Sequence, residues 1–165
     1  MAQVSVLILM GSDSDAPVMQ AAVDVLREFE IPCEMTVASA HRSPERVMRL
    51  VSEAPGRGVK VFIVGAGAAA HLGGVVAAHT SLPVIGVPID SSALKGWDAL
   101  LSTVQMPPGV PVATVSIGKP GATNAGVLAA QILAVGDSGL ATRLMQYKKK
   151  LAEKVEQAAA KLQQG

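Results

Sequence analysis

The sequence predicts an α/β protein in which a doubly wound parallel sheet lies between two layers of helices. Short apolar runs rich in β-branched residues alternate with segments in which apolar residues recur every three or four positions. With 165 residues, the chain is long enough for one ordinary domain with a single sizeable core. We therefore expect one domain over 1–165, with parallel strands joined by right-handed helical crossovers.

Five apolar runs are expected to form the strands. They cover about 4–9, 33–38, 61–64, 83–87 and 112–115. The first run has no basic residue before it and leads into Gly-Ser-Asp-Ser-Asp, which does not look like a small-residue cleavage site, so it indicates a strand and not a signal peptide.

Helices are expected between these strands. The first begins near Asp15, with Ser14 or Asp15 as the N-cap and Pro17 in the first turn. The second has Ser43 as its N-cap and Pro44 at the first helical position. Later helices are expected after a glycine- and alanine-rich turn at 65–74, and at 97–104 and 122–134. Five strands in this alternation are typical of a flavodoxin-like, three-layer sandwich.

The segment from Asp137 onward predicts a long C-terminal helix. Its apolar stripe recurs at spacings of three and four residues and consists of Leu140, Leu144, Tyr147, Leu151, Val155, Ala158 and Leu162. Such a stripe needs a partner, which is either its own domain or another subunit. The pattern alone leaves both open.

Composition disfavours several classes of protein. The chain has 14 basic and 13 acidic side chains and only 2% aromatic residues, which disfavours nucleic-acid binding. Cys33 stands alone, so an internal disulfide framework is excluded, and a small buried thiol in a reducing cytosol is expected. The apolar stretch 59–78 contains Lys60, His71 and several glycines, which favours a strand, loop and helix over a membrane span.

Polar residues follow the first three expected strands, in loops at 11–15, 39–44 and 65–72. In open parallel sheets, ligands bind beyond the carboxyl ends of the strands. The first loop places small residues and hydroxyls at a helix N-terminus, which favours an anion, and Asp15 suits a ribose diol. A simple capping cluster would explain the same residues.

The second and third loops carry the histidines. His41 could exchange a proton near neutral pH, and Arg42 could hold a phosphate or carboxylate, although a capped turn with a surface arginine is an alternative. Gly65 and Gly67 would let a ligand approach the backbone. His71 either contacts ligand or packs under the loop.

Other known site patterns fit poorly. The third loop lacks the Lys-Ser/Thr ending of a Walker loop. It is also a poor match to the glycine-rich motif that binds dinucleotides, although Asp90 lies at a plausible distance for the acidic residue of that motif, so nucleotide binding stays a weak alternative. His41, His71 and His79 do not have metal-ligand spacing, and His79 is expected to cap or end a helix. We therefore expect a site for an anionic small molecule that uses neither a metal nor a redox cofactor.

Ordered motifs give the sequence a more specific likeness. They are Met-Gly-Ser-Asp-Ser-Asp at 10–15, Ser-Ala-His-Arg-Ser-Pro at 39–44, Gly-Ala-Gly-Ala-Ala-Ala-His-Leu at 65–72, Pro-Val-Ile-Gly-Val-Pro at 83–88, and Val-Gln-Met-Pro at 104–107 with Gly-Val-Pro-Val-Ala-Thr at 109–114. Together they resemble the PurE family of purine biosynthesis, the N5-carboxyaminoimidazole ribonucleotide mutases, over about 4–133.

The resemblance implies an enzyme that moves a carboxyl group from the exocyclic nitrogen of its ribonucleotide substrate to C4 of the imidazole. His41 matches the catalytic histidine of the family, and Ser12, Asp15 and Arg42 match substrate-binding positions. The further candidate substrate contacts are Ser14, Ser39, Gly67, Ala70, His71 and Leu72. The family also implies a cytoplasmic homo-oligomer, typically an octamer, in which the helix over 137–165 packs on a neighbouring subunit.

Two alternatives remain. Related carboxylases that use CO2 directly carry a lysine after the histidine and lack the Ala-Ala-His-Leu string, so Arg42 and residues 69–72 favour the mutase. A non-catalytic nucleotide-binding module would share the fold without the chemistry. Departures from the family pattern occur at Ser43, Gly73 and Thr103, where threonine, proline and an aliphatic residue are usual.

Overall fold

A computed structural model describes residues 4–163 and shows a single five-stranded parallel sheet. The strand order is β2-β1-β3-β4-β5, so the direction of winding reverses beside β1. The strands are β1 (Val6–Met10), β2 (Cys33–Val37), β3 (Val61–Gly67), β4 (Val84–Ile89) and β5 (Ala113–Thr114). The predicted fold class is confirmed.

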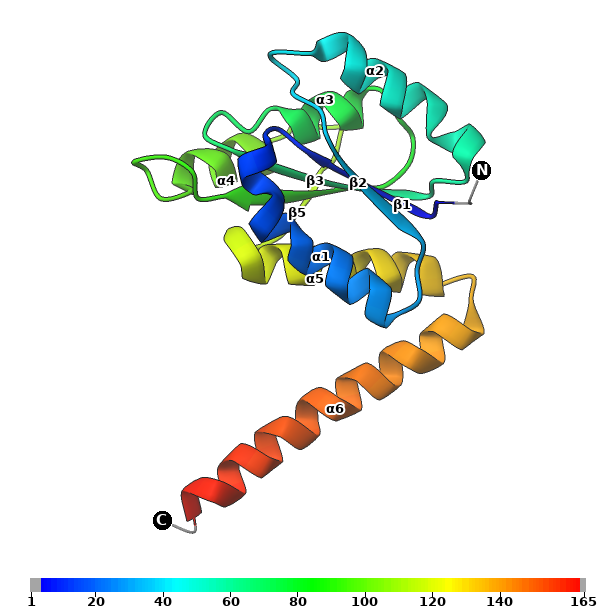
Figure 1. Cartoon of the computed structure of the whole chain (residues 1–165), viewed down its shortest axis with the longest axis vertical. Coiled ribbons are helices and arrows are strands. Elements are labelled where there is room, and N and C mark those ends of the chain that lie inside the picture. The colour runs from blue at the N-terminus through cyan, green and yellow to red at the C-terminus, as the bar shows by residue number, and fades with distance from the viewer. Residues whose placement is uncertain (1–3, 164–165) are drawn as a thin grey trace.

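Helices cover both faces of the sheet (Figure 1). They are α1 (Ala16–Glu28), α2 (Pro44–Glu53), α3 (Leu72–Ala78), α4 (Trp97–Val104), α5 (Gly118–Ala134) and α6 (Ser138–Gln163), with short 3-10 turns η1 (Asp13–Asp15) and η2 (Pro55–Arg57). Helices α1 and α5 lie on one face, and α2, α3 and α4 on the other, which is the three-layer arrangement that the alternating pattern predicts.

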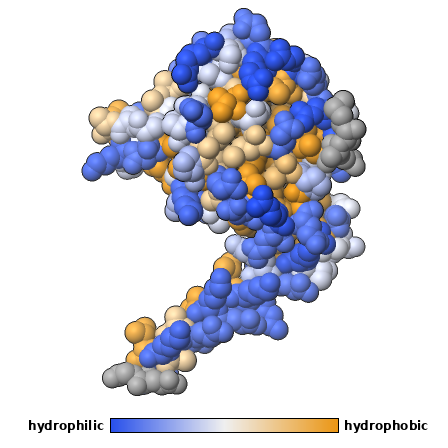
Figure 2. All heavy atoms as spheres, viewed as in Figure 1, coloured by the Kyte–Doolittle hydropathy of each residue, from blue (hydrophilic) through white to orange (hydrophobic). Residues whose placement is uncertain are grey.

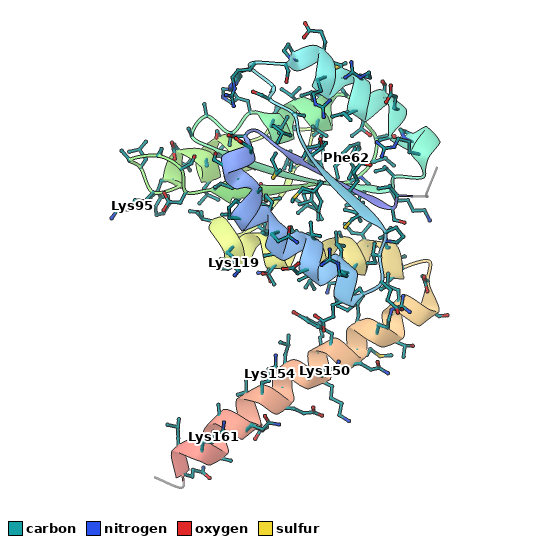
Figure 3. All side chains as sticks on the ribbon, viewed as in Figure 1. Phe62, Lys95, Lys119, Lys150, Lys154 and Lys161 are labelled. Atoms are coloured by element: carbon teal, nitrogen blue, oxygen red, sulfur yellow. The ribbon has the colours of Figure 1, made fainter. Side chains whose placement is uncertain are left out.

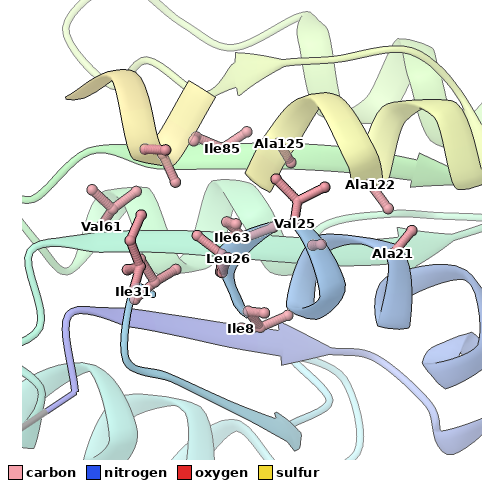
Figure 4. Packing of buried hydrophobic residues seen from close by; sticks show 14 of the residues in the cluster. Ile8, Ala21, Val25, Leu26, Ile31, Val61, Ile63, Ile85, Ala122 and Ala125 are labelled. Atoms are coloured by element: carbon pink, nitrogen blue, oxygen red, sulfur yellow. The ribbon is translucent and has the colours of Figure 1, made fainter. Parts of the chain in front are cut away.

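The strands alternate their side chains between the two faces. Ile8, Ile63 and Ile85 point toward α1 and α5, where Figure 4 shows them against Val25 and Leu26 of α1. Leu7, Leu9, Phe62 and Val64 belong to the cluster on the other face, beneath α2, α3 and α4. This two-residue period buries both faces, as expected for a central parallel strand.

A glycine lets α1 and α5 pack closely. A methyl group built on Gly126 would lie 2.9 Å from Cβ of Val25 and 3.0 Å from the carbonyl oxygen of Ala22. These contacts are closer than side chains normally tolerate, so the α1–α5 packing depends on hydrogen at this position.

Several boundaries differ from the predicted ones. The turn expected at 65–74 is wrong for its first residues, because β3 continues through Gly67, which pairs with Ile89 of β4. The alanine-rich helix begins at Gly118, four residues before the predicted start, and includes Pro120 in its first turn, where a missing N–H costs nothing. The helix predicted at 97–104 is confirmed.

The long helix α6 starts beside the body of the protein and extends away from it toward the C-terminus (Figure 1). Leu140 and Leu144 are buried against the core, and the Tyr147 ring meets Phe29 edge-on at 5.2 Å between centroids. Val155 and Leu162 are instead 66% and 85% exposed. Figure 2 shows hydrophobic residues along this projecting part among hydrophilic ones. Among the described residues, no helix is long and apolar enough to cross a membrane.

Candidate active site

The three predicted loops meet at the carboxyl edge of the sheet around a pocket of about 280 Å³. The lining residues come from the ends of β1, β2, β3 and β4. They are Gly11, Ser12, Ser14, Asp15, Ser39, Ala40, His41, Arg42, Ala66, Gly67, Ala69, His71, Leu72 and Ser91. The structure therefore brings together all but one of the candidate site residues, the exception being Ala70.

The first loop is held by a reciprocal pair of bonds in η1. The Ser12 hydroxyl oxygen accepts the N–H of Ser14, and the Ser12 N–H donates to Oδ2 of Asp15 at 3.1 Å. Asp15 lies at the N-cap position of α1, as predicted, but its side chain makes no cap bond there. A 3-10 turn precedes α1, and Ser12 caps that turn.

Asp15 is a buried carboxylate at the floor of the pocket, with 4% of its surface exposed. Burial raises the pKa of this carboxyl above its ordinary value of 3.8 and outweighs the bond from the Ser12 N–H and the positive charge of Arg42, both of which lower it. The neighbouring Asp13 charge also raises it. Asp15 is thus an acceptor held in a fixed position inside the pocket.

The second loop is a turn closed by serines. Ser43 lies at the N-cap position of α2, as predicted, but its hydroxyl bonds back to the N–H and carbonyl of Ser39 at 3.2 Å each. The Ser39 hydroxyl in turn accepts the N–H of Arg42. These bonds explain why a serine can replace threonine at position 43, since only the hydroxyl is used.

Arg42 joins the first and second loops. Its Nη2 donates to the carbonyl oxygen of Gly11 at 3.1 Å, and its side chain remains exposed at the pocket rim. A guanidinium carries five N–H donors, so the bond to Gly11 leaves donors that can hold an anion. Arg42 therefore brings a positive charge into the same pocket as the buried Asp15 carboxyl.

The two histidines of the site touch. Nε2 of His41 lies 2.8 Å from Nδ1 of His71, and the rings are nearly perpendicular, at 86° with 4.9 Å between centroids. One imidazole must donate the hydrogen bond and the other must accept it, so the tautomer of each ring depends on that of the other. Of the two roles left open for His71, the structure favours one at the pocket surface, because its ring lines the cavity beside His41.

The third loop is tightly bent. Ala68 has a left-handed backbone with φ of 51°, which is uncommon for a residue with a side chain. A methyl group on Gly67 would lie 1.8 Å from the Ser91 hydroxyl, so glycine is needed for this approach. Sequence reasoning missed Ser91, although it follows the fourth strand and the same rule about carboxyl ends would have found it.

Ala70 lies beneath the pocket and not on its surface. The residue is 2% exposed and belongs to the core on the α2, α3 and α4 side, and its N–H donates to the Ser102 hydroxyl of α4 at 3.0 Å. Leu72, by contrast, is buried and also lines the pocket. This geometry therefore does not support the expectation that the Ala70 side chain contacts the substrate.

The remaining predicted residues lie away from the pocket chemistry. Nδ1 of His79 lies 2.8 Å from the carbonyl oxygen of Val75 at the end of α3, which confirms its expected helix-end role. Cys33 is half-buried, and burial raises the pKa of its thiol. Within residues 4–163, no group of three or more His, Cys, Asp or Glu side chains could hold a metal ion.

Two departures from the family pattern are accommodated by the packing. Thr103 is buried on α4, where its hydroxyl donates to the carbonyl of Ala99 at 2.7 Å and its methyl faces Gly86. Gly73 lies in the first turn of α3, where a helix N–H has no partner within the helix, so either glycine or proline fits the backbone.

Comparison with known proteins identifies the family. The family model described as AIR carboxylase matches residues 5–154. The chain belongs to the AIR carboxylase family. Among its relatives, the N5-carboxyaminoimidazole ribonucleotide mutase of Bacillus subtilis is 58% identical over 83% of this chain and 85% of its own length. The mutase of Pyrococcus horikoshii is 52% identical over 95% and 88%.

A longer relative and a solved structure agree with this assignment. The phosphoribosylaminoimidazole carboxylase of Candida glabrata is 53% identical over 94% of this chain, which spans only 27% of that protein's length. The crystal structure of Treponema denticola PurE superposes with a TM-score of 0.85 at 31% identity and covers 95% of this chain and 97% of its own. The PurE resemblance of the motifs is confirmed.

Proposed function

We propose that this member of the AIR carboxylase family is an N5-carboxyaminoimidazole ribonucleotide mutase. It would convert N5-carboxyaminoimidazole ribonucleotide to 4-carboxyaminoimidazole ribonucleotide in purine biosynthesis. The observation that carries the proposal is the position of the His41 imidazole over a pocket that also contains Ser12, Asp15 and Arg42. Relatives that carry the mutase name match nearly the whole chain, which supports the same activity.

The first half of the reaction is a decarboxylation. The bond between the exocyclic nitrogen and the carboxyl carbon breaks, its electron pair stays on nitrogen, and His41 gives a proton to that nitrogen. CO2 and aminoimidazole ribonucleotide are left in the pocket. An imidazole suits this step because it exchanges protons near neutral pH.

The second half forms the new carbon–carbon bond. C4 of the imidazole attacks CO2, and His41, now neutral, removes the proton from C4. The histidine ends in the state in which it began, so one group serves both halves with no net proton exchange. Retaining CO2 between the halves requires a site that excludes water, and small residues such as Ala66, Gly67 and Ala69 supply apolar lining beside His41.

The polar residues of the pocket would hold the ribonucleotide. Asp15 is buried and fixed by the Ser12 N–H, which suits a carboxyl group that accepts hydrogen bonds from ribose hydroxyls. Arg42 and the hydroxyls of Ser12, Ser14 and Ser39 face the same space and suit the phosphate and the carboxyl group. His71 and Leu72 would contact the substrate beside His41. No metal or cofactor is required for these steps.

The chain is further proposed to act as a cytoplasmic homo-oligomer, an octamer, built from a single α/β domain whose helix over 137–165 packs on a neighbouring subunit. Two exposed apolar surfaces support this assembly. One is the projecting half of α6, and the other is the outer side of α4, where Trp97 and Leu101 are 63% and 52% exposed. Large exposed apolar side chains in groups are typical of subunit contacts.

Isotope-labelled bicarbonate tests the proposed activity. The purified protein is given unlabelled N5-carboxyaminoimidazole ribonucleotide in medium that contains 13C-bicarbonate, and the product carboxyl is followed by NMR. A mutase gives product whose carboxyl carbon is unlabelled in the first turnovers. Free entry of label, or efficient conversion of aminoimidazole ribonucleotide at low bicarbonate, would show a direct carboxylase instead.

A further inference from the structure

We propose that Ser102 of α4 is a positioning residue that holds His71 against His41. Ser102 lies outside the set of described residues that line the pocket, and its effect would pass through the backbone of the third loop. The proposal rests on the proposed function, because it assigns Ser102 a part in holding the proton-transfer group of that reaction.

The Ser102 hydroxyl is oriented by its own helix. It donates to the carbonyl oxygen of Asp98 at 2.8 Å, with the carbonyl of Ala99 at 3.2 Å. A hydroxyl has one proton and two lone pairs, so this donation leaves the oxygen free to accept. It accepts the Ala70 N–H at 3.0 Å. The oxygen thus ties the third loop to α4 in a defined direction.

The loop that it holds is bent and carries His71. Ala68 is left-handed, at φ 51°, and the N–H of His71 donates to the carbonyl of Ala69 at 2.8 Å, which is a very tight turn. Left-handed backbone at a residue with a side chain persists only where the surroundings hold it. The bond from Ala70 to Ser102 lies inside this turn, one residue before the histidine.

Loss of this bond would act on the histidine pair. His71 follows Ala70 directly in the chain, and its Nδ1 lies 2.8 Å from Nε2 of His41. A small displacement of the His71 ring would break a hydrogen bond of this length. If Ser102 lost its oxygen, the Ala70 N–H would be left without its acceptor. The backbone of the turn would then move until this N–H found another acceptor. His71 would then leave the hydrogen bond that orients His41.

Valine and threonine at position 102 test the role of the oxygen, because the two side chains have nearly the same shape and differ by one hydroxyl. We expect Ser102→Val to lower kcat by about tenfold to a hundredfold, the loss typical of a small misplacement, while KM changes little. Ser102→Thr should restore most of kcat. Ser52→Val is a matched control, since that hydroxyl also bonds a carbonyl of its own helix but lies on α2.

Ring spectra test the positioning without turnover. The chain contains three histidines, so 15N-histidine labelling gives three ring systems, which His41→Asn and His79→Asn variants assign. In Ser102→Val the 15N chemical shifts of the His41 and His71 ring nitrogens should change, and those of His79 should stay the same.

Three results would overturn the proposal: retention of kcat in Ser102→Val, an equal loss of kcat in the threonine variant, or unchanged His71 signals. If the wild type lacked mutase activity, the proposed function would fail while the spectra still decided the role of Ser102.

Discussion

The pocket loops and the C-terminal helix are attached to the same sheet by different interactions. The loops are held by short polar bonds, among them Ser12 with Asp15, Arg42 with the Gly11 carbonyl, and Ala70 with Ser102. Helix α6 is held by apolar contacts near its start, and its far half projects from the body (Figure 1). Figure 3 shows Lys150, Lys154 and Lys161 along that far half.

Because of this difference, substitutions in the two regions should have different effects. Polar bonds to backbone groups fix direction as well as distance, so the loops can present His41, Arg42 and Asp15 in a defined geometry. Apolar contacts depend on buried area and have little direction. Changes in the loops should therefore affect chemistry with little effect on folding, and changes in the packed half of α6 should do the reverse.

Replacement of His41 by asparagine should have the largest effect and should be confined to activity. We expect turnover to fall by about 10²–10⁴-fold, the usual contribution of a general acid and base. Product formation by NMR measures the rate, and calorimetry with the product measures binding. The thermal unfolding midpoint should stay near that of the wild type, because the His41 side chain is exposed. A variant that kept its turnover would instead support a non-catalytic nucleotide-binding module.

Leucine-to-alanine replacements at the two ends of α6 should differ sharply. Leu140 is 3% exposed and Leu162 is 85% exposed. We expect Leu140→Ala to lower the free energy of unfolding by about 2–5 kcal/mol, as for other buried leucines. Leu162→Ala should cost less than about 0.5 kcal/mol in the monomer.

Urea denaturation at several protein concentrations makes this measurement and also tests the assembly. If the far half of α6 docks on another subunit, the cost of Leu162→Ala should grow where the oligomer forms, because docking then buries that side chain. Equal costs at both leucines in dilute protein would contradict the contrast between the packed and projecting halves.

Alanine at Gly126 should disturb the packing of α1 against α5 by a smaller amount. The added methyl would meet Val25 at 2.9 Å, so we expect a loss of about 1–3 kcal/mol, as for other overpacked cores. Gly136→Ala is the matched control, because a methyl there meets open space. Thermal unfolding measures both. Turnover per folded molecule should be unchanged in each, and a large loss in activity would show that this packing and the site are coupled.

Asparagine at Asp15 should have the smallest effect on stability, and that effect should depend on pH. Burial raises the pKa of Asp15, so the folded state holds this proton more tightly than the unfolded state, and ionisation lowers stability as pH rises from about 3.8 through the folded-state value. The asparagine side chain of the variant does not ionise and so lacks this loss, and its amide oxygen can still accept the Ser12 N–H.

Urea midpoints between pH 3 and pH 7 follow this difference. Relative to the wild type, Asp15→Asn should become more stable as pH rises, and the gap should close at the acid end. KM for the ribonucleotide should rise at neutral pH, because a carboxylate would be lost from the proposed ribose contact. A gap that stayed constant with pH would show that burial does not govern this carboxyl.

Much of the site was predictable because one rule about parallel sheets covers it. His41, Arg42, Asp15 and Ser12 each follow a strand, and parallel strands end at one edge, so their convergence needs only the strand assignment. The direct contact between His41 and His71 was not predictable. The two lie 30 positions apart, and spacing along the chain does not specify a contact of 2.8 Å between side chains of two different loops.

Strand ends and cap residues were predicted less well than the elements themselves. The glycines at 65–67 looked like the start of a turn, yet they pair with β4, because a central strand can use small residues where helices or loops approach closely. Ser12 was one of several possible caps in a run of serines and aspartates. Local pattern does not choose among them, since all have suitable oxygens.

By itself, the sequence determined the α/β class, the periodic faces of the helices and the set of loops that hold the polar residues. These follow from spacing along the chain, which fixes which side chains share a face. Only the tertiary structure decided that Ser102 supports the third loop, that Ala70 lies beneath the pocket, and that the apolar stripe of α6 is covered at one end alone. Such facts depend on distances between segments far apart in sequence, and these distances are set by packing.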